Sequence, residues 1–186
     1  VRKVLKIAKE HQTLDRFMQG QRLQDEKIEW EFKWCFYGCM TQTKDNTLKK
    51  ATEVMWLPAW IIHVSEKIFE WLPEKDALKF PLELLEKIPT GVDTYQLWKD
   101  WSYTLLMDKE NWNIKYCWNN QECIDAVKQC AELFKTDFAE SAAESVALSA
   151  ARSAESAAES AESAAKQNHF IWLRNTLYKL LQNTWA

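Results

Sequence analysis

Glycine and proline are scarce in this sequence, with 3 and 4 copies among 186 residues. β-Sandwiches and β-barrels need many tight turns, and these two residues supply most of them. The scarcity therefore argues against an all-β fold. The glycines stand at positions 20, 38 and 91, too scattered to build a Walker or dinucleotide-binding loop.

Excess charge and long apolar runs are also missing. The net charge is -3, so the composition carries no electrostatic signature of DNA or RNA binding. The apolar run WLPAWIIHV is interrupted by Pro58 and His63. No run approaches the roughly 20 residues needed to cross a bilayer, so we expect no membrane partner. From the net charge we likewise expect no nucleic-acid partner.

Residues with the spacing of metal ligands or catalytic groups are few. The three histidines lie far apart, and neither Cys-x-x-Cys nor His-Glu-x-x-His occurs. Cys35 and Cys39 are one helical turn apart and could supply two ligands, but two small core thiols are the favoured interpretation. The paired glutamates read as solvated helix faces. We therefore expect no metal, no cofactor and no catalytic residue, and a protein that is not an enzyme.

Cysteine usage indicates the cellular compartment. The count is five, an odd number, in a chain without a recognisable secretory segment. A disulfide framework is not expected for such a chain, and we predict a cytoplasmic location. The cysteines are Cys35, Cys39, Cys117, Cys123 and Cys130.

What the chain has in abundance is helical periodicity. Apolar residues spaced by three and four predict helices over 2–18, 45–56, 58–72, 93–107 and 119–134. Residues 74–88 are expected to form a helical turn and then, after Pro81, a helix that carries Leu82, Leu85 and Ile88. Pro58 and Pro73 bound the helix over 58–72, and Asp93 or Thr94 caps the helix over 93–107. Pro89, Gly91 and Asp93 form the strongest loop signal in the chain, just before that cap. Residues 28–37 alternate like a strand but also place Trp30 and Trp34 four apart, and we favour a helix because no partner strand is evident.

The stretch 140–166 is almost entirely Ala, Ser and Glu. Its serines recur at steps of four and three over about six turns, with Glu, Leu or Arg before each and Ala or Val behind. A disordered acidic linker has no reason to keep this phase, and Ala has the highest helix propensity. We predict one long helix over 137–166, with a low-complexity tether as the alternative. Its alanine face lets a neighbouring helix approach closely, which includes a second copy in a homo-oligomer.

These elements predict an all-α fold, a single compact helical domain of about seven or eight helices. Residues 1–136 would form a Trp-rich core, since most of the 11 tryptophans are expected inside. The long helix 137–166 would pack along it, followed by an amphipathic helix over 168–185.

Aromatic and cationic residues cluster in two places. Rings beside an ammonium group suit a nucleotide, because bases stack on rings and phosphates attract cations. The turn that opens the 93–107 helix could also bind phosphate through free amides, although an ordinary loop is the simpler interpretation. The candidate ligand-binding residues are Trp98, Lys99, Trp101, Tyr103, Thr94, Gly91, Trp30, Lys33 and Trp34. For the tryptophans, the alternative is a place in the core.

A set of Leu-Pro, Phe-Pro and Ile-Pro motifs resembles an uncharacterised family of phage and bacterial proteins that often end in a long Ala-rich helix. The resemblance covers roughly 57–107, and 121–166 more loosely. The matching residues are Leu57, Pro58, Trp60, Ile68, Phe69, Glu70, Leu72, Pro73, Phe80, Pro81, Ile88, Pro89, Gly91, Val92 and Asp93. Some relatives with similar tails are called immunity proteins.

The resemblance implies a role in phage–host conflict. We expect a non-catalytic binding protein that sequesters a nucleotide-type immune signal or blocks a defence protein. A toxin-neutralising immunity protein and an enzyme of unknown type are the alternatives. The expected partner is accordingly a small nucleotide-type ligand, or a host or toxin protein.

Overall fold

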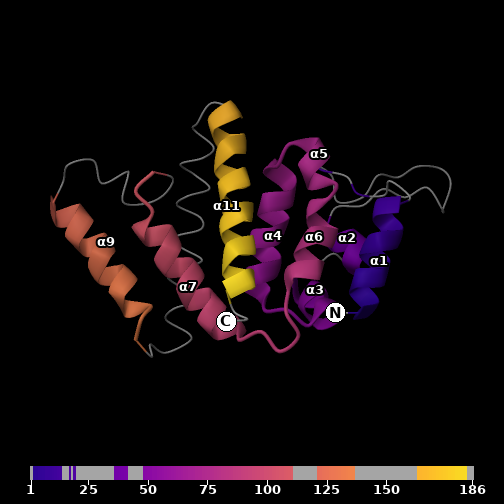
Figure 1. Ribbon diagram of the computed structural model, residues 1–186, viewed down its shortest axis with the longest axis horizontal. Helices are drawn as coiled ribbons and strands as arrows, with labels where there is room; N and C mark the ends of the chain where they lie inside the picture. The colour runs from indigo at the N-terminus through magenta and orange to yellow at the C-terminus, as the bar shows by residue number, and fades with distance from the viewer. Residues whose placement is uncertain are drawn as a thin grey trace. The chain divides into compact units, whose positions relative to one another are not determined.

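The computed structural model describes residues 2–13, 17, 19, 36–41, 48–110, 121–136 and 163–183. Within these ranges every regular element is a helix, so the all-α prediction is confirmed (Figure 1). The chain divides into two compact units, Val1–Ile88 and Pro89–Ala186, which are described separately. The division falls at the Pro89–Asp93 segment, where the sequence has its strongest loop signal.

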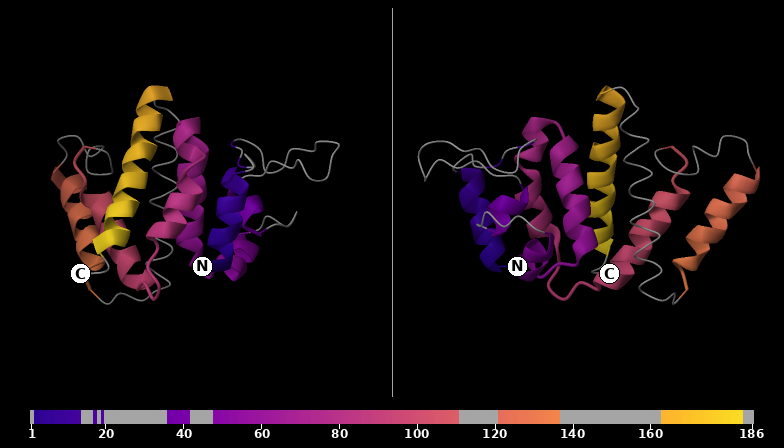
Figure 2. Two further views of the ribbon diagram at one scale, coloured as in Figure 1. Left: turned by 45° about the vertical axis from the view of Figure 1, so that its right-hand side comes forward. Right: turned by 180° about the vertical axis from the view of Figure 1, so that it is seen from behind.

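Unit 1 contains six of the described helices. They are α1 (Arg2–Thr13), α2 (Phe36–Thr41), α3 (Leu48–Met55), α4 (Ala59–Trp71), α5 (Glu74–Ala77) and α6 (Phe80–Lys87). Helix α1 packs against α6 and α2, and Figures 1 and 2 show these three side by side. Helix α2 in turn contacts α3 and α4. The N-terminal helix therefore closes onto the last helix of its own unit.

Phenylalanines hold the centre of unit 1. Phe69 of α4 is fully buried, and its ring centroid lies 6.2 Å from both Phe17 and Phe36. The Phe36 ring also lies 6.4 Å from Phe80 of α6. Tilted ring pairs at this separation are favourable beyond the apolar area that they bury. Four parts of the sequence are thus joined in one series of aromatic contacts, from Phe17 through Phe69 and Phe36 to Phe80.

Prolines set the boundaries of α4 as the sequence predicted. Pro58 is the N-cap, and the helix ends at Trp71, with Leu72 as its C-cap before Pro73. The side-chain amide of Gln19 donates to the carbonyls of Phe69 and Leu72, the second at 2.9 Å. Carbonyls in the last turn of a helix lack helical partners, and Gln19 supplies one from 50 residues away.

Unit 2 contains α7 (Thr94–Met107), α9 (Gln121–Leu133) and α11 (Ser163–Asn183). Helix α7 contacts both of the others. The Trp98 ring of α7 meets the ring of Phe134, just beyond α9, edge-on at 5.8 Å. Helix α11 carries a buried apolar stripe at helical spacing, formed by Phe170, Leu173, Leu177 and Leu181. Leu180, expected on the same side, is half-buried.

Several predicted boundaries differ from the observed ones. Helix α1 ends at Thr13, earlier than the predicted stop near Gly20, and Phe17 and Gln19 lie outside any helix. Helix α11 begins at Ser163 rather than at 168, so the last residues of the Ala-rich stretch belong to it. Residues 137–162 of the predicted long helix and 28–35 of the ambiguous segment lie outside the described residues.

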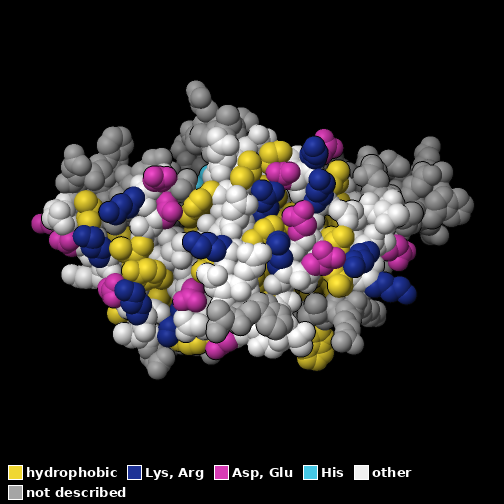
Figure 3. Space-filling view, viewed as in Figure 1, with side chains coloured by type: hydrophobic (Ala, Val, Ile, Leu, Met, Phe, Trp, Pro, Cys, Tyr) yellow, Lys and Arg dark blue, Asp and Glu magenta, His cyan; other side chains and the backbone are white. Residues whose placement is uncertain are grey.

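Surface charge follows the balanced composition. On the face drawn in Figure 3, lysine and arginine side chains alternate with aspartate and glutamate, with apolar side chains between them. In the part of the chain that the structure describes, no helix has both the length and the apolar character needed to cross a membrane.

Candidate functional site

The start of α7 was one candidate anion site. Asp93 is the N-cap, and one of its carboxylate oxygens accepts hydrogen bonds from the amides of Tyr95 at 3.0 Å and Gln96 at 2.9 Å. Gly91 precedes the cap in the left-handed region at φ +78, where glycine is unstrained. The carboxylate thus occupies the position that a phosphate would take. This geometry favours the ordinary-loop interpretation over a phosphate site at Gly91 and Thr94.

The two tryptophans of the first cluster lie in the interior. Trp98 is 7% exposed and Trp101 is 3% exposed. Their burial matches the core alternative, since a buried ring does not present its face to a ligand in solvent. Trp30, Lys33 and Trp34, the second cluster, lie outside the described residues.

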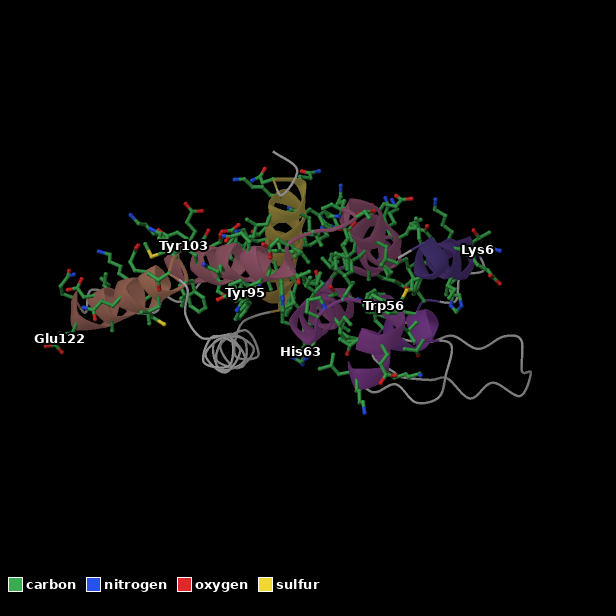
Figure 4. All side chains as sticks on the ribbon, turned by 90° about the horizontal axis from the view of Figure 1, so that it is seen from below. Lys6, Trp56, His63, Tyr95, Tyr103 and Glu122 are labelled. Atoms are coloured by element: carbon green, nitrogen blue, oxygen red, sulfur yellow. The ribbon has the colours of Figure 1, made fainter. Side chains whose placement is uncertain are left out.

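Tyrosines and lysines line another side of α7. Tyr95, Lys99 and Tyr103 are four residues apart, so they fall within an arc of about 80°. The Lys99 ammonium lies 5.5 Å from the centroid of the Tyr95 ring. Lys135, just after α9, places its ammonium 4.4 Å from the Tyr103 ring. We call these four residues the tyrosine–lysine face, and Figure 4 labels both of its tyrosines on α7.

A neighbouring carboxylate sets the electrostatics around Lys135. The Lys135 ammonium donates to Glu132 at 2.8 Å. This hydrogen bond, with a further one to Tyr103, raises the pKa of Lys135 above its ordinary value. The ammonium is therefore fully charged at neutral pH. An anionic ligand would have to compete with Glu132 for it.

Ser102 adds an unsatisfied polar group to the same region. It is 5% exposed, and its hydroxyl has no hydrogen-bond partner among the described residues. It follows Lys99 by three residues and precedes Tyr103, so it borders the tyrosine–lysine face. Buried hydroxyls are nearly always hydrogen-bonded in proteins. A water molecule or a polar ligand atom would satisfy this one.

Further described groups that could take part in chemistry include two thiols and a buried histidine. Cys39 is a buried thiol and Cys130 a half-buried one. No cluster of three or more His, Cys, Asp or Glu side chains suited to a metal ion occurs in the described ranges. His11 is buried in α1 with its ring 6.1 Å from Phe17, which places it in the aromatic core of unit 1.

Of the residues that the sequence singled out, Lys99 and Tyr103 lie on the same side of α7, where Lys99 is buried and Tyr103 is half-buried. Sequence reasoning missed Tyr95, although it stands one turn before Lys99. It also missed Lys135 and Ser102. Nothing in the local pattern pairs Lys135 with Tyr103, because 32 residues separate them and only the packing of α9 on α7 brings them together.

Comparisons of the chain with protein-family models, with curated proteins and with solved structures found no match. The chemistry of the described residues is therefore the basis for a functional proposal.

Proposed function

We propose that the protein is a non-catalytic binding protein that takes a nucleotide-type ligand on the tyrosine–lysine face. The observation that supports this is the pairing of two ammonium groups with two tyrosine rings along one side of α7. A tyrosine ring can stack on a base, which is worth about 1–3 kcal/mol. A lysine ammonium can bind phosphate through charge-assisted hydrogen bonds.

The two ends of the face are suited to different parts of such a ligand. Tyr103 is half-exposed, and Lys135 is 52% exposed at its side chain, so this end is open to solvent. Lys99 is only 8% exposed, and Ser102 lies close to it in sequence with its hydroxyl unsatisfied. We assign the base to Tyr103 and a phosphate to Lys135. A sugar hydroxyl or second phosphate would reach Lys99 and Ser102.

Binding at Lys135 requires an exchange of partners. Glu132 holds the ammonium in the free protein, and its side chain is 58% exposed, so it can rotate into solvent. Exposed ion pairs of this kind contribute little to stability. A ligand phosphate presents two anionic acceptor oxygens and is held in place by the stacked base, so it can replace the carboxylate at the ammonium.

The biological setting of the proposal comes from the family resemblance. Binding without turnover would lower the free concentration of a nucleotide immune signal during phage infection. Stoichiometric sequestration requires no catalytic residue, which agrees with the lack of a catalytic motif in the sequence.

The test is a thermal-shift screen followed by calorimetry, with cyclic nucleotides and ADP-ribose-type nucleotides as probes. A bound ligand raises the melting temperature, and the shift grows with the logarithm of the ligand concentration once that exceeds the Kd. Tyr103→Ala and Lys135→Met should each weaken binding about tenfold or more. Lys128→Met, which removes another exposed lysine of α9, should leave affinity unchanged.

The outcomes separate the candidate functions. A shift that is lost in both site variants, with the nucleotide recovered intact by mass spectrometry, supports the proposal. Turnover of the nucleotide would make the protein an enzyme. No shift with any probe would overturn the nucleotide ligand, and a toxin-neutralising immunity protein would then be the better explanation.

A further inference from the structure

Ser65 and Ser102 are both buried in helices, but they differ in their hydrogen bonds. Ser65 of α4 is 0% exposed, and its hydroxyl donates to the carbonyl of Ile61, four residues before it, at 2.6 Å. Ser102 of α7 is 5% exposed, and its hydroxyl has no partner among the residues that the structure describes. A helical serine can bond a carbonyl three or four residues before it. Ser102 therefore forgoes a partner that its own helix offers.

A buried hydroxyl without a partner lowers the stability of the folded protein, because it has given up its hydrogen bonds to water. Alanine at the same position would avoid this cost and has the higher helix propensity. Groups that reduce stability in this way are typical of sites where function opposes stability. The Ser102 hydroxyl therefore indicates a ligand that supplies the missing hydrogen bond.

Ser102 lies next to the buried part of the tyrosine–lysine face. It follows Lys99 by three residues and Tyr95 by seven, so the three side chains fall within an arc of about 60° on α7. Side chains of a helix tilt towards its N-terminus, which brings Ser102 over the turn that carries Lys99. Lys99 is 8% exposed, and its ammonium lies 5.5 Å from the centroid of the Tyr95 ring. A charged donor and an unsatisfied hydroxyl are thus neighbours on a buried side of the helix.

The burial of both groups favours a neutral ligand group over a second phosphate. Transfer of an anionic phosphate from water into a buried site costs far more free energy than transfer of a hydroxyl. The Lys99 ammonium can only donate hydrogen bonds, whereas the Ser102 hydroxyl can donate and accept. A sugar hydroxyl fits this pair, because its oxygen can accept from Lys99 while its hydrogen is donated to the Ser102 oxygen.

We propose that Ser102 determines the specificity of the site for the sugar, and that the ligand is a ribonucleotide whose 2′-hydroxyl bonds Ser102 and Lys99. This role rests on the proposed function, in which the base stacks on Tyr103. A site built to bond a ligand hydroxyl discriminates against the analogue that lacks it, because its own polar groups then stay unpaired. The Ser102 hydroxyl is covered in the free protein, so the sugar reaches it when nearby side chains rotate, such as the flexible four-carbon stem of Lys99.

The stability of the free protein gives the first test. Ser102→Ala removes an unsatisfied hydroxyl and should raise the melting temperature by at least about 2 °C. Ser65→Ala is the matched control, because it gains the same helix propensity but loses the bond to Ile61. It should melt no higher than the wild type. If Ser102→Ala melts below the wild type, the hydroxyl has a partner in the free protein, such as a water molecule, and the proposed role is overturned.

Calorimetry with paired nucleotides gives the second test. The probes are ADP-ribose and 3′,5′-cyclic AMP, each compared with its analogue that lacks the adenosine 2′-hydroxyl. The wild type should bind a ribose form about tenfold more tightly than its deoxy form. Ser102→Ala should bind the two forms about equally, whereas Ser65→Ala should discriminate like the wild type.

The outcomes distinguish the role of Ser102 from the nucleotide site itself. Equal binding of both sugars by the wild type, with affinity still lost in Tyr103→Ala, would overturn the role of Ser102 and leave the nucleotide site in place. Discrimination that persists in Ser102→Ala would also overturn it, since the 2′-hydroxyl would then be read elsewhere. No binding of any probe would overturn the proposed function, and the sugar specificity with it.

Discussion

Removal of the Asp93 cap should destabilise α7 through two separate losses, that of its hydrogen bonds and that of its negative charge. The carboxylate accepts hydrogen bonds from the amides of Tyr95 and Gln96, at 3.0 and 2.9 Å. Replacement of an N-cap by alanine costs about 0.5–2 kcal/mol. Part of that is the attraction between the negative charge and the helix dipole, typically about 0.3–1 kcal/mol.

Two variants separate these contributions. Asp93→Asn keeps an acceptor but removes the charge, so we expect a loss of about 0.3–1 kcal/mol in the free energy of unfolding. Asp93→Ala removes both and should lose about 1–2 kcal/mol, which corresponds to roughly 2–4 °C in melting temperature for each kcal/mol in a chain of this length. Asp100→Ala serves as the control, because Asp100 accepts from the Gln96 side chain in the middle of the same exposed face.

Urea unfolding, followed by circular dichroism, measures these differences directly. The expected order of stability is wild type and Asp100→Ala, then Asp93→Asn, then Asp93→Ala. If Asp93→Ala unfolds within about 0.3 kcal/mol of the wild type, the amides at the start of α7 find other partners. The Asp93 carboxylate would then not be what keeps a phosphate from these amides.

Three other predictions concern the aromatic core, the Lys135 ammonium and the backbone of Trp56. Phe69→Ala should lower the free energy of unfolding by about 3–5 kcal/mol, and Phe69→Leu by much less, because only alanine leaves a large cavity among the rings; urea unfolding measures both. The pKa of Lys135 is raised in the folded protein. The charged side chain therefore contributes fully to folding stability below the ordinary lysine pKa, and this contribution is lost as the pH rises through the pKa of the folded state. An NMR titration of Lys135 should move to lower pH in Glu132→Gln, and an unchanged titration would contradict the assigned cause. Trp56, between α3 and α4, has φ 57 in the left-handed region, where a large L-residue is strained and glycine is not. Trp56→Gly should melt no lower than the wild type in calorimetry, since relief of the left-handed strain offsets the added freedom of the unfolded chain.

The fold was predictable where the signal is local. The Asp93 cap, the Pro58 start and the Pro73 stop are short-range effects on backbone dihedrals and free amides, and each helix boundary that depends on them was found near the predicted position. The buried stripe of α11 was visible for the same reason, as a 3.6-residue period. The end of α1 was not predictable, because Phe17 leaves the helix to meet Phe69, a partner 52 residues away.

The site was predictable only in part. Periodicity places Lys99 and Tyr103 on one side of α7. It cannot say that Trp98 and Trp101 face inward, since core tryptophans and ligand-binding tryptophans would have the same spacing. Lys135 reaches Tyr103 through tertiary packing alone. The left-handed backbone of Trp56 also has no sequence signal, because glycine or asparagine is the residue expected there.

The bond from Gln19 to the end of α4 has a consequence for how unit 1 assembles. Proline has no amide hydrogen, so Pro73 cannot donate to the last carbonyls of α4, and Gln19 supplies a donor from 50 residues upstream. A contact that spans so many residues closes slowly, because the intervening chain must first lose its freedom. The C-terminal end of α4 should thus reach its final structure late in folding, when Gln19 has packed against it.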